Sequence, residues 1–321
     1  MKLMRRRIII TLLAFFAAVN LDFILPRLVP GSAAEVFASR SILPAHEVQL
    51  ISARLGLNQP LLVQYELYLK GLFTGWPPYF GVSYQYYPVP ASSIIVERIP
   101  WTMMLILVSL VLSIAISFIL VGFTSMRRGG RGELASMFSS ILFWSIPAFW
   151  VGMVLVWVFA VSLGWFPLFG NVDFKAGSGL NYAYSVLIHA VLPVATLTAA
   201  IFGQNYILLR SATQEVLKSD YVLAAKCRGL KSKAIAFGYI LRNSLLPIVS
   251  LLGYSLAGLI STVIVVEAVF GYQGVGDLFL DGLYNRDYPV LEGSFFFITL
   301  LVLIGGLIGD YLLTRLDPRV R

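Results

Sequence analysis

The sequence contains few charged residues and almost no cysteine or histidine. Lys, Arg, Asp and Glu make up 12% of its 321 residues, against roughly 25% in ordinary globular domains. One cysteine, Cys227, excludes a disulfide within the chain. Two histidines far apart, His46 and His189, give too few ligands for a metal site. With 58% hydrophobic residues, the chain is not composed like a soluble protein of this length.

Motifs for chemistry are also missing. No GxxxxGK[ST] loop is present to hold phosphates, so this chain is not expected to bind ATP. The glycine run 129–132 is interpreted as a turn between two apolar segments. No Ser/His/Asp arrangement indicates a hydrolytic enzyme. The net charge of +8 does not indicate a nucleic-acid partner, because the basic residues lie at the ends of apolar segments.

Long apolar runs are what the sequence has instead. A helix needs about 20 apolar residues to cross a bilayer, and only helices or closed barrels satisfy their backbone groups in lipid. Alternation with period two is absent, which argues against a barrel. We therefore predict an all-α integral membrane protein with about six transmembrane helices. The predicted segments are 8–25, 102–123, 138–164, 187–209, 245–270 and 291–314.

Lysine and arginine predict the orientation, since short cytoplasmic loops collect these residues. Four basic regions fall on one side of six spans: the N-terminal tail, the second and fourth connections, and the C-terminal tail. Both termini are therefore expected in the cytoplasm of a multi-pass inner- or plasma-membrane protein. Arg5-Arg6-Arg7 before an apolar run also resembles a signal peptide. Because the run continues to Leu25 without a clear cleavage site, we expect a retained first span.

The organisation follows from these spans. We predict one membrane domain over residues 1–321, with an extracytoplasmic insertion at 28–100 after the first helix and a cytoplasmic loop at 210–244 between the fourth and fifth. In that loop Ser219 and Asp220 are residues that begin helices, and Gly229 is typical of a helix end. A short helix outside the membrane is expected. From the pattern alone it is either a lipid-surface helix or a site for another protein.

Polar residues inside the spans are candidates for a transport path, since such residues usually face a bundle interior or water. Gln204 and Asn205 are the strongest of them. Helix–helix hydrogen bonding or placement at the interface is the alternative, and it suits Asp22 and Asp310 at least as well. The sequence therefore leaves both interpretations open.

The loop carries a resemblance to a known family. The stretch 220–230, Asp-Tyr-Val-Leu-Ala-Ala-Lys-Cys-Arg-Gly-Leu, resembles the signature loop of ABC-transporter permease subunits. The spacing to 242–247, Arg-Asn-Ser-Leu-Leu-Pro, resembles the dipeptide/oligopeptide branch. Further matches occur in order along the chain, at 28–31, 59–61, 81–83, 145–150, 163–167, 266–270, 274–276, 286–289 and 316–321.

The resemblance implies roles for particular residues. The short helix would be a coupling helix that docks on an ATPase subunit. Its docking residues would be Asp220, Tyr221, Ala224, Ala225, Arg228 and Gly229. An external gate would include Glu267, Gly274 and Gly276. The implied partners are a second related permease, two cytoplasmic ATPases that use ATP and Mg, an extracytoplasmic binding protein, and membrane lipid.

The expected function is thus that of a permease subunit in an ATP-driven ABC importer, without enzymatic activity or a bound cofactor of its own. The alternatives are a secondary transporter or channel, which would need an ion site or filter, and a membrane enzyme, which would need a catalytic constellation. The resembling family most often carries peptides, but also oligosaccharides, nickel or glutathione. The expected cargo is an oligopeptide or an oligosaccharide.

Overall fold

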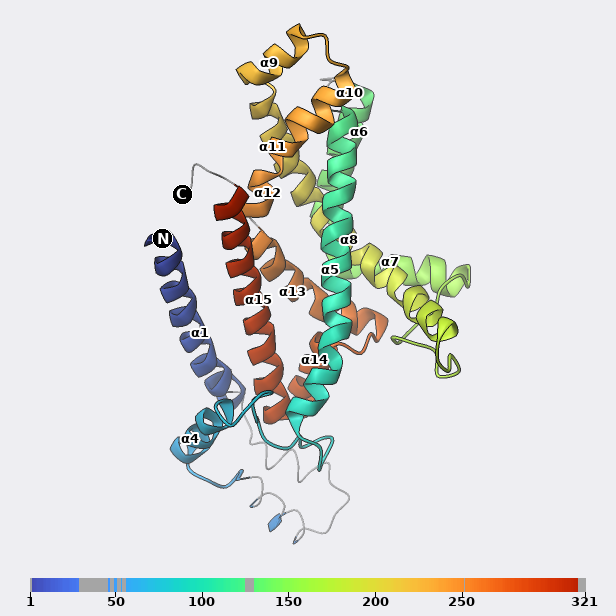
Figure 1. Ribbon diagram of the computed structural model, residues 1–321. Helices are drawn as coiled ribbons and strands as arrows, with labels where there is room; N and C mark the ends of the chain where they lie inside the picture. The colour runs from blue at the N-terminus through green and yellow to red at the C-terminus, as the bar shows by residue number, and fades with distance from the viewer. Residues whose placement is uncertain are drawn as a thin grey trace. The chain divides into compact units, whose positions relative to one another are not determined.

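The computed structural model describes residues 2–28, 46, 49–50, 53, 56–124, 130–250 and 252–316. Within these residues the secondary structure is helical, apart from one isolated β-bridge between Val82 and Pro90 (Figure 1). The predicted all-α class is confirmed. Arg127, Arg128 and the C-terminal motif after Leu316 lie outside the described residues, as does most of the stretch 29–55.

The helices in chain order have the following bounds: α1 (Lys2–Leu28), α4 (Leu61–Leu72), α5 (Ala91–Thr124), α6 (Arg131–Ser145), α7 (Ala148–Leu155), a π-helix (Val156–Ser162), α8 (Leu180–Val216), α9 (Asp220–Cys227), α10 (Ser232–Ala234), a second π-helix (Ile235–Leu241), α11 (Arg242–Ser244), α12 (Leu246–Ser250), α13 (Leu252–Phe270), α14 (Val275–Asn285) and α15 (Tyr288–Leu316).

Four of these helices are long and apolar enough to cross a membrane as single elements: α1, α5, α8 and α15. Two more spans are formed only if each of two bent pairs is counted as one. These pairs are Arg131–Ser145 with Ala148–Ser162, bent by 99°, and Ser255–Phe270 with Val275–Asn285, bent by 77°. The prediction of about six spans therefore agrees with the structure, while two of the six are broken.

The break in the third span has a local cause. Pro147 has no backbone N–H to donate, and its ring disfavours helical backbone at the residue before it. Ile146 accordingly has extended backbone, with φ −84° and ψ 128°. The predicted segment 138–164 is therefore two helices that meet at Ile146-Pro147, not one.

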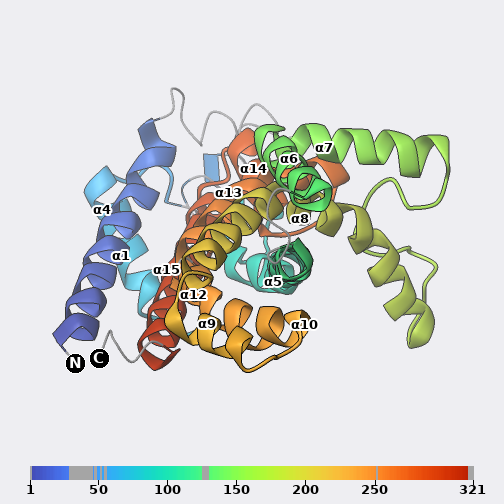
Figure 2. The same cartoon turned by 90° about the horizontal axis from the view of Figure 1, so that it is seen from above.

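The chain divides into two compact units, and both draw on separated stretches of sequence. The first unit comprises Met1–Arg5, Met103–Tyr272 and Ile304–Arg321, and the second comprises Arg6–Thr102 and Gln273–Leu303. In the first unit α6 lies along α8, and Figure 2 shows α9 beside the segment that contains α10. Its inner cluster includes Val121, Phe202, Tyr206, Leu209, Leu241 and Ile248.

The second unit joins α1, α4 and α14 with the N-terminal parts of α5 and α15, up to Thr102 and Leu303. Its core is rich in aromatic side chains: Val19, Phe23, Tyr68, Phe80, Ala91, Ile95, Leu278, Val290, Phe296 and Phe297. The rings of Phe80 and Phe296 lie 5.4 Å apart and those of Phe23 and Tyr65 5.1 Å apart, distances at which aromatic pairs attract each other. Tyr65, Tyr68 and Phe80 of the predicted insertion are therefore packed into a core, whereas Phe73 and Trp76 are exposed.

Candidate functional site

The loop between α8 and α12 begins with a helix start at Ser219. Ser219 has extended backbone, and its carbonyl accepts the N–H groups of Val222 (3.1 Å) and Leu223 (3.3 Å). It therefore occupies the position before the helix that the sequence predicted. Its hydroxyl does not cap α9, because it donates to the carbonyl of Val216 in the preceding turn.

The end of α9 follows the pattern that a glycine permits. Gly229 has φ +74°, which L-residues with a side chain rarely adopt. Its N–H donates to the Lys226 carbonyl (2.9 Å), and the Leu230 N–H donates to the Ala225 carbonyl (3.4 Å). This pair of bonds is the Schellman arrangement, which uses carbonyls that the helix leaves unpaired. The predicted stop at Gly229 is confirmed.

The two sides of α9 have different roles. Val222 and Ala225 are buried in a small cluster with Ile235 and Ile240 of the second π-helix. The opposite side carries Asp220, Leu223, Ala224 and Cys227, which share one face because they are three or four residues apart. Leu223 is 61% exposed. Small and apolar atoms are thus presented outward.

Ala225 differs from the expectation for it. The family resemblance placed Ala225 among the docking residues of the short helix, but Ala225 is only 2% exposed. Periodicity alone could not decide this, because the buried side is set by the distant Ile235 and Ile240. Tyr221 and Arg228 are exposed and flank the outward face.

The surroundings of α9 are basic. Exposed lysines and arginines in the loop are Lys218, Lys226, Arg228, Lys231 and Lys233. The described residues 214–234 contain two acidic side chains, Glu215 and Asp220. The positive potential of this loop favours an acidic protein surface or anionic lipid.

The two polar residues proposed for a transport path lie on α8. Asn205 is buried, and its Nδ2 donates to Ser113 Oγ of α5 at 2.8 Å. This is the helix–helix hydrogen bond that the sequence left open as the alternative. Gln204 is partly exposed. A role of either residue in the path stays a prediction.

The proposed gate residues lie in different units. In the first unit Glu267 is fully buried, and its carbonyl accepts the Tyr272 N–H at 2.8 Å. In the second unit Gly274 begins α14, where the Val275 N–H donates to Thr102 Oγ1 at 2.8 Å. Gly276 is buried in the first turn of α14. Their role in a gate stays a prediction.

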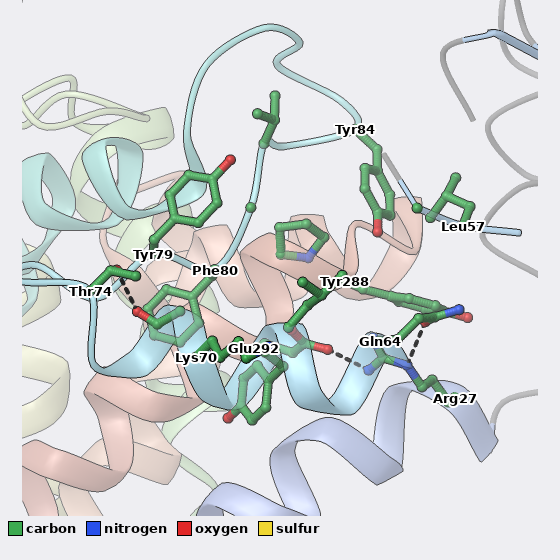
Figure 3. A pocket seen from close by; sticks show the side chains of 17 residues that line it. Arg27, Leu57, Gln64, Lys70, Thr74, Tyr79, Phe80, Tyr84, Tyr288 and Glu292 are labelled. Atoms are coloured by element: carbon green, nitrogen blue, oxygen red, sulfur yellow. Dashed lines mark hydrogen bonds and ion pairs between the residues drawn. The ribbon is translucent and has the colours of Figure 1, made fainter. Parts of the chain in front are cut away.

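A polar pocket in the second unit escaped the sequence prediction. It encloses about 410 Å³ and is lined from α1, α4, α15 and the loop before α5 (Figure 3). Arg27 and Glu292 form an ion pair inside it, with side chains only 14% and 4% exposed. The guanidinium also lies 3.6 Å from the centre of the Phe23 ring. The only local signal was a charged residue within each of two apolar helices.

Burial changes the acid–base behaviour of the side chains outside the spans. Burial, and then the carboxylates of Asp22 and Glu292, raise the pKa of Tyr68, which donates to Asp22 at 3.0 Å. Burial also raises the pKa of Tyr84. Burial raises the pKa of Asp287, although hydrogen bonds from Ser83 and the Gln85 N–H act in the opposite direction. Tyr68 is therefore a neutral hydrogen-bond donor to Asp22.

Helices of spanning length, joined by an ordered basic loop, are the features of a polytopic membrane protein. Comparison with known proteins identifies the family. Residues 113–321 match the family described as binding-protein-dependent transport system inner membrane component, and residues 1–106 match its N-terminal membrane component. The chain belongs to this family of ABC-importer permease subunits. The predicted membership and the multi-pass inner-membrane location are confirmed.

Three relatives illustrate the match. The oligopeptide transport system permease protein AppB of Bacillus subtilis is 32% identical over 318 residues, which cover 98% of both chains. The oligopeptide permease OppB of Haemophilus influenzae is 31% identical over 321 residues, covering 100% of this chain and 99% of the relative. The dipeptide permease DppB of Lactococcus lactis is 28% identical over 320 residues, with the same coverage.

Proposed function

We propose that this chain forms, with a second related permease, the membrane path of an ATP-driven importer of oligopeptides. Two cytoplasmic ATPases would hydrolyse ATP, and an extracytoplasmic binding protein would deliver the cargo. The match along the full chain to oligopeptide and dipeptide permeases supports peptides over oligosaccharides. ATP binding would draw the coupling helices together and rock the permeases between outward-open and inward-open states.

The outward face of α9 is the observation that carries this proposal. Its inner side is filled by its own loop, so Leu223, Ala224 and Cys227 are left for a partner. A small side chain at Ala224 permits close approach of another backbone. The basic residues around the face favour an acidic ATPase surface over a neutral one. Their exposure supports Asp220, Ala224 and the flanking Tyr221 and Arg228 as the proposed docking residues.

Replacing Ala224 with tryptophan should release the ATPase. An oversized side chain in a packed interface typically costs about 1–3 kcal/mol, which corresponds to a loss of affinity of about 5- to 150-fold. Copurification of the ATPase with tagged permease, from detergent extracts of cells that produce the whole complex, measures this loss. Ala234→Trp is the matched control, because Ala234 is also exposed but lies on α10.

A lipid-surface helix would behave differently. Tryptophan suits a membrane interface, so Ala224→Trp would then leave ATPase recovery at the wild-type level. That result would remove α9 as the docking element. Ala225→Trp is not an equivalent test, because it would overpack the buried cluster around Val222 and disturb the loop itself.

The orientation can be tested with the native cysteine. Cys227 is exposed in the loop proposed to be cytoplasmic. A membrane-impermeant maleimide should modify it in inside-out vesicles from cells that lack the ATPase subunits, where the docking face is uncovered, but not in spheroplasts. Gln85→Cys, placed at an exposed external position in a Cys227→Ser background, should show the reverse accessibility. Modification of both cysteines from the same side would contradict the proposed topology.

A further inference from the structure

Helices α6 and α8 are joined at two points that belong to one antiparallel register. At the first point, a Cβ added to Gly203 would lie 2.2 Å from the carbonyl oxygen of Ser140. At the second, Arg210 forms an ion pair with Glu133. The two points are seven residues apart on each helix, which is about two turns or roughly 10 Å. A single rigid alignment satisfies both.

The two contacts differ in kind. At Gly203 the absence of a side chain allows the backbones of α6 and α8 to come close together. At the other point, Arg210 Nε and Nη2 both donate to Glu133 Oε1, at 3.0 Å and 2.8 Å. The Glu133 side chain is only 7% exposed. The Arg210 side chain is 35% exposed, so the pair is half-buried and adds little net stability. Because two nitrogens of Arg210 donate to one oxygen of Glu133, the pair resists sliding of one helix along the other. The pair therefore suits a role in positioning.

The ion pair also lies near the coupling loop. Arg210 is six residues before the end of α8 at Val216. Val216 and Leu217 pack against the same cluster that holds the inner side of α9, with Val222 and Ala225. A displacement of α9 therefore acts on the end of α8. From α8, the ion pair of Arg210 with Glu133 connects to α6. Helix α6 leads directly into the bend at Ile146-Pro147.

We propose that Glu133 and Arg210 are a positioning pair that makes α6 follow α8 and α9 during the transport cycle. The pair would carry the motion of the coupling loop into the bent third span. This inference rests on the proposed function, because the motion of α9 is the one that a docked ATPase would impose. Gly203 keeps the helices in contact, while the ion pair prevents them from sliding past each other.

Nitroxide distances in the complete reconstituted complex test the proposal. One label is placed at Leu134→Cys on α6, where the side chain is 57% exposed, and one at the exposed Glu215→Cys near the end of α8, in a Cys227→Ser background. In the otherwise native chain the distance should be the same without nucleotide and after trapping with ATP and vanadate. In a Glu133→Leu/Arg210→Met variant the distance should shift on trapping.

The apolar double variant removes both charges together, so that Glu133, which is only 7% exposed, is not left without its partner. The charge-swapped variant Glu133→Arg/Arg210→Glu should restore the constant distance, which a merely structural role does not require. An unchanged distance in the apolar variant would overturn the proposal, as would a shift on trapping in the native chain. If the apolar variant does not accumulate, Glu133→Gln replaces it with the same expected shift. Failure of the ATPase to copurify with the native chain would instead overturn the proposed function.

Discussion

Replacing Gly203 with alanine should destabilise the permease by about 3 kcal/mol, near the upper end of the usual cost of overpacking. The added Cβ would lie 2.2 Å from the Ser140 carbonyl oxygen and 2.6 Å from Trp144 Cβ. The carbonyl belongs to the backbone of α6 and cannot rotate away. Alanine gains about 0.5–1 kcal/mol over glycine within a helix, so the steric cost exceeds this gain. Helices α6 and α8 must then separate.

Thermal unfolding of the detergent-solubilised permease, followed by its tryptophan fluorescence, measures this effect. Gly258→Ala is the matched control, because Gly258 lies within α13 and a Cβ there meets no atom within 4 Å. The control should unfold at the wild-type temperature or above it. A Gly203→Ala variant as stable as Gly258→Ala would show that α6 and α8 do not approach this closely in the folded protein.

The parts of the fold that depend on local chemistry could be predicted from the sequence. The stop at Gly229 required only a residue that tolerates positive φ, and the spans at α1, α5, α8 and α15 required only length and apolar composition. The bend at Ile146-Pro147 was also a local feature, but an apolar run of membrane length concealed it. Hydropathy averages over the residues on both sides of such a proline.

The parts that depend on distant partners could not be predicted. Which side of α9 is buried depends on Ile235 and Ile240, beyond the turn at Gly229. Asn205 could be recognised as polar within a span, but its bond to Ser113 joins residues 92 positions apart. Residue spacing predicts which side chains share a face of a helix. It does not predict which distant residues pack against that face.

The ion pair of Arg27 and Glu292 shows this limit most clearly, since 265 positions separate its partners. Replacing Arg27 with methionine should destabilise the protein by about 3–5 kcal/mol, because the carboxylate of Glu292 would remain buried without its cation. The planar guanidinium also stacks on the Phe23 ring, which a lysine ammonium cannot do in the same way. Arg27→Lys should therefore recover only part of the lost stability. Unfolding of the solubilised permease by heat measures the order of these variants.

The double variant Arg27→Met/Glu292→Leu gives the sharper result. With both charges removed, neither partner is left buried without its counter-ion, and apolar side chains of similar volume often restore or exceed the original stability. The double variant should therefore be more stable than Arg27→Met alone, although it carries one more substitution. Lys70→Met is the matched control: Lys70 pairs with Glu66 on α4, but both side chains are about two-thirds exposed, at 67% and 65%. Water and salt screen such a pair, so this control should unfold like the wild type. If Arg27→Met unfolded like Lys70→Met, or if the double variant were less stable than Arg27→Met, Arg27 and Glu292 would not form a buried pair in the folded permease.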